Sequence, residues 1–154
     1  MRVLRFVCLG AALLLSACGA NQSGSLSLAP LPFAMEVPAG IVSRLATGLV
    51  EGPFGEEVRA AGALASTTVF YSPVEQGEKV IFMTAYWFPA EKFDALQLPD
   101  QPPRFGAEVL RKDGKVLSVA GPVDAIFPPD TPDGQNLTQL YGVIYLPGTY
   151  RAID

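Results

Sequence analysis

The ten residues 79–88, KVIFMTAYWF, constrain the fold of this chain more than any other segment. Alternate side chains of a β-strand point to opposite faces of its sheet, and in this run both faces are apolar. The pattern predicts an interior strand that other elements cover on both sides. One face would carry Val80, Phe82, Thr84, Tyr86 and Phe88, and the other would carry Ile81, Met83, Ala85 and Trp87.

Further strands are predicted around this one. Residues 33–37 alternate before a proline, and residues 64–73 are rich in β-formers. Residues 74–78 would join the second of these strands to 79–88 as a hairpin. In residues 108–119, Asp113-Gly114 predicts a type I′ turn between two alternating runs, because that turn needs positive φ at both central positions. The turn would pair Lys112 with Lys115 and Leu110 with Leu117.

Two short helices are predicted, at residues 90–98 and 136–146. Phe93 and Leu96 are three positions apart in the first helix, and an apolar stripe of helical period marks the second. Residues 41–50 are ambiguous, because apolar residues recur at every fourth position but Thr47 and Gly48 weaken a helix. Residues 51–57 resemble a turn, and 127–134 form a proline-rich loop. The predicted class is α+β, an antiparallel sheet with the two helices packed on it, and the alternative is an all-β sandwich. The stripe consists of Leu137, Leu140, Tyr141 and Ile144.

The N-terminal segment has the composition of a secretory signal. Arg2 and Arg5 precede an apolar run that is too short to span a bilayer as a helix. The run ends in Leu15-Ser16-Ala17-Cys18, which resembles the lipobox of bacterial lipoproteins. The resemblance implies cleavage after residue 17 and a lipid on Cys18. Residues 18–31 would then form a flexible tether, and 32–154 a single globular domain.

The same resemblance implies a location. The protein would lie outside the cytoplasmic membrane, and Gly19 after Cys18 resembles lipoproteins that are passed on to an outer membrane. It would face the periplasm there, or the outside of the cell membrane in a host without an outer membrane. The order of strand, central meander and closing helix also looks like PsbP/Mog1-type α+β domains, a likeness of topology that implies no function.

Composition excludes several functions. The chain contains no histidine, and after signal removal it keeps neither Cys8 nor an unmodified thiol, so His- and Cys-dependent catalysis and metal binding are excluded. Residues 18–154 carry a net charge of −6, because two of the 11 basic residues leave with the signal while all 15 acidic residues remain. An acidic domain repels phosphate backbones, so we expect no nucleic-acid partner. No cofactor or metal is expected.

Candidate site residues are aromatic. Trp87, Tyr86 and Tyr71 lie on one predicted hairpin and could form a ligand or partner surface, as an alternative to being sheet core. Carboxylates are weaker candidates for site residues. Asp130 and Asp133 share the loop with Gly134 and could bind Ca²⁺. The alternative is that Asp133 or Asn136 caps a helix. Asp124 could be an acid or base, or could pair with Arg104 or Arg111.

Three functions follow from these features. We expect first a non-enzymatic, membrane-anchored module that binds another envelope protein or polymer. The alternative is a carrier that holds a small apolar ligand between sheet and helix. An enzyme that relies on carboxylates such as Asp124 and Asp130 is the third.

Overall fold

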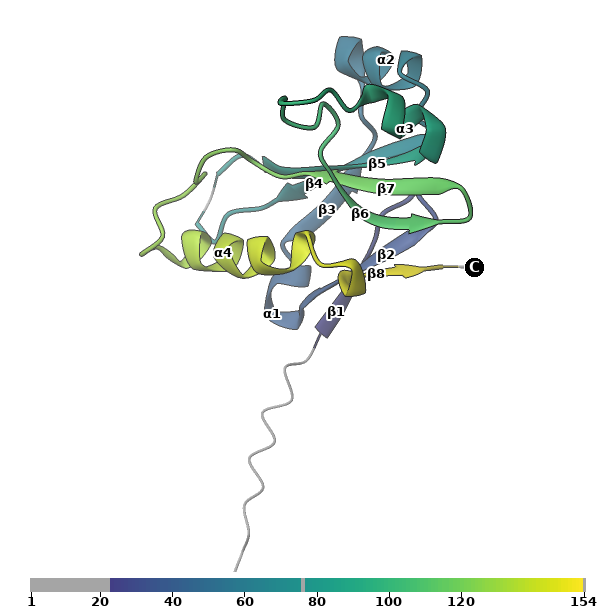
Figure 1. Cartoon of the computed structure of the whole chain (residues 1–154). Coiled ribbons are helices and arrows are strands. Elements are labelled where there is room, and N and C mark those ends of the chain that lie inside the picture. Colours follow the sequence, from purple (N-terminus) through teal and green to yellow (C-terminus); the bar gives the residue numbers. More distant parts are fainter. Residues whose placement is uncertain (1–22, 76, 154) are drawn as a thin grey trace, which may run out of the picture.

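The computed structural model describes residues 23–75 and 77–153. Two antiparallel sheets form the domain (Figure 1). The larger sheet has five strands in the order β3-β4-β5-β7-β6, and the smaller has three in the order β1-β2-β8. The large-sheet strands are β3 (Leu45–Gly48), β4 (Ala65–Tyr71), β5 (Val80–Pro89), β6 (Ala107–Lys112) and β7 (Lys115–Ala120). The small-sheet strands are β1 (Ser23–Ser27), β2 (Phe33–Pro38) and β8 (Tyr150–Ala152).

The helices cover both faces of the five-stranded sheet. Helices α2 and α3 lie on one face, and α4 lies on the other beside the three-stranded sheet (Figure 1). The α+β class with an antiparallel sheet is therefore confirmed, although there are two sheets and more helices than predicted. The helices are α1 (Ala39–Val42), α2 (Gly52–Ala60), α3 (Ala90–Leu96) and α4 (Pro132–Ile144), and a 3-10 turn, η1, spans Pro147–Thr149.

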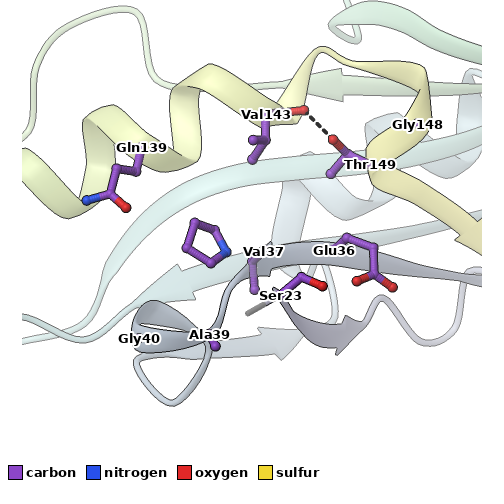
Figure 2. Close-up of a pocket in the computed structure, with 10 residues that line it drawn as sticks. Ser23, Glu36, Val37, Ala39, Gly40, Gln139, Val143, Gly148 and Thr149 are labelled. Atoms are coloured by element: carbon purple, nitrogen blue, oxygen red, sulfur yellow. Dashed lines mark hydrogen bonds between the residues drawn. The ribbon is translucent and has the colours of Figure 1, made fainter. Parts of the chain in front are cut away.

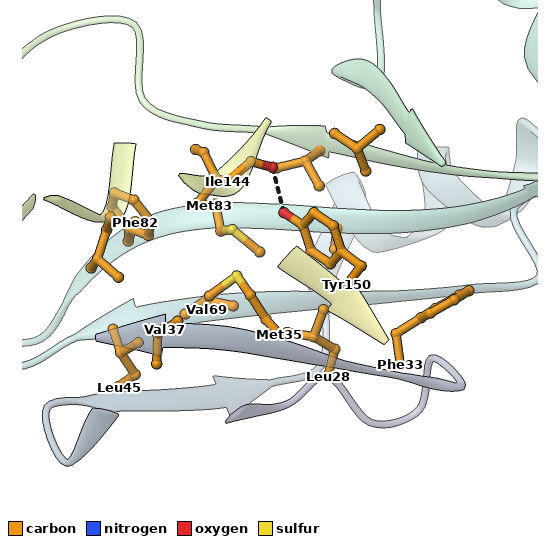
Figure 3. Packing of buried hydrophobic residues seen from close by; sticks show 14 of the residues in the cluster. Leu28, Phe33, Met35, Val37, Leu45, Val69, Phe82, Met83, Ile144 and Tyr150 are labelled. Atoms are coloured by element: carbon orange, nitrogen blue, oxygen red, sulfur yellow. Dashed lines mark hydrogen bonds between the residues drawn. The ribbon is translucent and has the colours of Figure 1, made fainter. Parts of the chain in front are cut away.

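The five-stranded sheet separates two apolar cores. The larger core lies between this sheet, the three-stranded sheet and α4, and includes Met35, Met83 and Ile144 (Figure 3). The smaller core lies under α2 and α3, where Phe88 packs on Phe93 and Phe105. Burial on both faces explains why β5, the middle strand, carries large apolar side chains on both of its faces. The prediction of a central strand covered on both sides is confirmed.

A β-bulge alters the faces predicted for β5. Val69 pairs with Met83 and Phe70 pairs with Ile81, so Phe82 is an extra residue on its strand. As a result Phe82 joins the larger core with Met83 and Trp87, whereas strict alternation put Phe82 and Trp87 on opposite faces. Ile81, predicted to share a face with Met83, is 60% exposed.

The hairpin of β6 and β7 has the predicted register. Lys112 pairs with Lys115 and Leu110 with Leu117, and the two turn residues Asp113 and Gly114 have φ of 51° and 69°. Both angles lie in the left-handed region that a type I′ turn requires.

Three local predictions were wrong. Residues 23–31 are part of the domain rather than a tether, because β1 pairs along its length with β2 and Leu28 and Leu31 are buried. Residues 51–57 lie mostly in α2, whose first turn holds a proline, a position at which proline is favoured. Residues 41–50, for which no single element was predicted, contain the end of α1 and all of β3. Helix α4 begins at Pro132, inside the predicted loop, and Thr131 caps it by accepting a hydrogen bond from the Gly134 N–H.

Candidate functional site

The three aromatic residues predicted to form one surface lie in three different surroundings. Tyr71 is fully buried in the larger core, and Tyr86 is buried on the opposite face of the sheet against Phe105. Trp87 is half-buried, with its ring edge-on to that of Phe33, 5.0 Å between centroids. Tyr71 and Tyr86 are therefore core residues, and of the three only Trp87 keeps an exposed part.

Tyr71 is the centre of a small polar network. Its hydroxyl donates to the Asp133 carboxylate over 2.7 Å and accepts from the Asn136 side chain over 2.8 Å. The same Asp133 oxygen also accepts from the Val74 N–H. Burial, followed by the hydrogen bond to Asp133, raises the pKa of Tyr71 above its ordinary value. The network joins the end of β4 to the first turn of α4, which gives Asp133 and Asn136 a structural role instead of the predicted capping one.

The remaining carboxylate candidates are dispersed. Asp124 and Asp130 are both exposed. The arginines predicted as partners of Asp124 pair elsewhere, Arg104 with Glu57 and Arg111 with Asp94 and Glu108. Within residues 23–75 and 77–153, no group of three or more carboxylate, histidine or cysteine side chains converges as a metal site would require.

A groove lies between β2 and α4, which the sequence did not indicate. It has a volume of about 710 Å³, and Figure 2 shows its floor formed by β2 and its wall by α4. The lining is mixed, with Val37 and Val143 beside Gln139 and Glu36. The other lining residues are Ser23, Pro38, Ala39, Gly40, Gly148 and Thr149.

Small residues line much of this groove and leave it open. A β-carbon added at Gly40 or Gly148 would meet no atom within 4 Å, so larger side chains there would point into free space. Thr149, beside Gly148, is held by its hydroxyl, which donates to the Val143 carbonyl over 2.8 Å (Figure 2). The far side is held by an ion pair between Glu36 and Arg151. The groove is therefore open at Gly40 and Gly148 and bordered by these two fixed contacts.

A second, smaller cavity of about 150 Å³ lies beside Trp87 at the turn between β6 and β7. Both apolar and charged side chains line this cavity. The half-buried Trp87 is one of them. Its lining consists of Pro32, Phe33, Trp87, Lys112, Asp113, Lys115, Ala152 and Ile153.

Comparison with known proteins found no protein-family model, no curated protein and no solved structure that matches this chain. In the described part of the chain, no helix is long and apolar enough to cross a membrane.

Proposed function

We propose that this chain is a bacterial lipoprotein whose domain is a non-enzymatic binding module of the cell envelope. The lipid on Cys18 holds it to the membrane outside the cytoplasm, on the periplasmic face of the outer membrane where the host has one. The partner is a segment of another envelope protein, bound in the groove between β2 and α4.

The position of the groove relative to Cys18 carries this proposal. Only four residues lie between Cys18 and Ser23, the first residue of β1 and part of the groove lining. The five residue-to-residue steps from Cys18 to Ser23 span at most about 18 Å when fully extended. A lipid on Cys18 would therefore hold Ser23, one of the residues that line the groove, within that distance of Cys18 and so near the bilayer surface. Two or three acyl chains on one residue anchor a protein stably.

The lining favours a polypeptide over a lipid. A backbone can approach closely at Gly40, Gly148 and Ala39. The side chains of Gln139 and Glu36 offer hydrogen-bond acceptors, and that of Gln139 also offers donors. Sites for apolar small molecules are lined mainly by large hydrophobic and aromatic side chains, and this groove has no aromatic lining residue. The volume and the position between sheet and helix nevertheless fit the carrier alternative, so the test must separate the two.

Photo-crosslinking in cells separates them. A photoreactive amino acid in place of Gln139 lies in the groove, whereas the same group in place of the exposed Gln135 lies on α4 outside the groove lining. We expect a protein adduct at Gln139 that is absent at Gln135 and is lost on Gly148→Phe, which fills the groove. The exposed Gly142→Phe is the matched control, because its β-carbon is equally unobstructed. A lipid adduct at Gln139 would favour the carrier, and no specific adduct would contradict both.

Anchoring is tested separately. Cys18→Ala should abolish incorporation of a labelled fatty acid and release the protein from the membrane fraction. Label in the variant equal to that in the wild type would show that Cys18 is not the lipidation site.

A further inference from the structure

The cavity beside Trp87 combines an apolar wall with two cationic groups. Trp87 and Phe33 pack edge to face, and Ile153, which is 42% exposed, completes the apolar side. The Ile153 N–H donates to the Pro32 carbonyl over 3.1 Å, which ties the end of the chain to the loop before β2. The apolar wall is therefore built from three segments distant in sequence.

The cationic side is formed by the β6–β7 hairpin. Lys112 and Lys115 are directly opposite each other across the ladder, next to the Asp113-Gly114 turn. Like charges in this position destabilise a hairpin. Neither lysine has a salt-bridge partner among the described residues, and Asp113 is the only acidic residue in the lining. Among the residues that the structure describes, the lining thus carries two positive charges and one negative charge, on a chain whose net charge is negative.

We propose that this cavity binds the free C-terminal carboxylate of a polypeptide whose last side chain is apolar. The two ammonium groups receive the carboxylate, and the side chain packs on Trp87 and Ile153. Charge complementarity selects an anion, and the size of the cavity selects a chain end. A volume of about 150 Å³ equals the liquid volume of about five water molecules.

That space takes one small residue and not two. In a C-terminal residue the carboxylate and the side chain branch from one Cα, so a single residue supplies both groups. An acidic side chain next to an apolar one would need two residues and more room. This site is independent of the groove between β2 and α4 and of lipid on Cys18, so it can fail while the proposed function holds.

The test uses the intrinsic fluorescence of Trp87, the only tryptophan in the chain. The full chain in detergent micelles is titrated with a short neutral peptide that ends in alanine or valine with a free carboxylate. We expect a saturable change in emission. Affinity should fall at least tenfold when the same peptide carries a C-terminal amide, and also in the Lys112→Gln/Lys115→Gln variant.

The matched control is Lys79→Gln/Lys92→Gln, which removes the same charge from two exposed lysines outside the cavity and should bind like the wild type. Circular dichroism verifies that both double variants are folded. A third peptide, amidated but with an internal aspartate next to valine, tests the other source of a carboxylate. Three results would overturn the proposal: no saturable change, equal binding of the amidated peptide, or equal binding of the aspartate peptide.

Discussion

The hydroxyl of Tyr71 has two partners in a place without access to water. It donates to Asp133 and accepts from Asn136, and both partners belong to the first half of α4. Because an unpaired buried polar group costs more than a hydrogen bond contributes, such a network fixes how α4 docks on the sheet. Tyr71, which the sequence suggested as a binding residue, therefore helps to hold α4 on the sheet.

We predict that Tyr71→Phe lowers the free energy of unfolding by about 1–3 kcal/mol, because it leaves the buried Asp133 with one donor fewer. Urea denaturation followed by circular dichroism measures the loss. Tyr145→Phe is the control, since the Tyr145 hydroxyl accepts only a 3.2 Å bond from the Gly121 N–H and the residue is 44% exposed. We expect it to change stability by less than about 0.5 kcal/mol. Equal losses in the two variants would contradict the network.

At the scale of elements, the bulge in β5 decides which side chains reach the larger core. Phe82 is fully buried there, and its ring is 5.5 Å from that of Tyr141 on α4. The neighbouring Ile81 points out of both cores. Because of this one inserted residue, Phe82 occupies the place in the larger core that simple alternation gives to Ile81.

Phe82→Ala should cost about 3–5 kcal/mol, because it leaves a cavity in the larger core. The adjacent Ile81→Ala should stay within about 0.5 kcal/mol, since its side chain is mostly in water. Thermal and urea unfolding of both variants measure the two losses of stability for comparison. If Ile81→Ala were the more damaging, the register between β4 and β5 described above would be wrong.

At the scale of the whole molecule, burial of tyrosines links stability to alkaline pH. Burial is the largest cause of a raised pKa at Tyr71, Tyr86, Tyr141 and Tyr150. The native state thus holds these protons more tightly than the unfolded chain, in which tyrosine ionises near pH 10. Stability from this source is complete below pH 10 and is lost as the pH rises through the native pKa values.

We therefore predict that the urea midpoint falls between pH 10 and pH 12. Tyr150→Phe should make that fall shallower, although it also removes a hydrogen bond to the Ile144 carbonyl and so lowers the midpoint at pH 8. A midpoint that stays constant up to pH 12 in the wild type would refute the prediction.

Local patterns determined the elements whose partners are close in sequence. Asp113-Gly114 predicted the β6–β7 register, because a type I′ turn fixes which residues face each other. The stripe of Leu137, Leu140 and Ile144 predicted α4, because one face of that helix is buried. Strand β5 was predicted as central from its two apolar faces alone.

Only the tertiary structure decided the rest. Strand β1 has the sequence SGSLS, which has no strong β-pattern, and it is a strand because β2 supplies its hydrogen-bond partners. Helix α2 buries a single large apolar side chain, Val58, which gives too weak a periodicity to detect. The groove and the cavity beside Trp87 collect residues more than 100 positions apart, from β1 and η1 and from β2 and β8. The physical reason is that a sequence pattern records contacts between neighbours along the chain, whereas these sites form only when distant segments pack together.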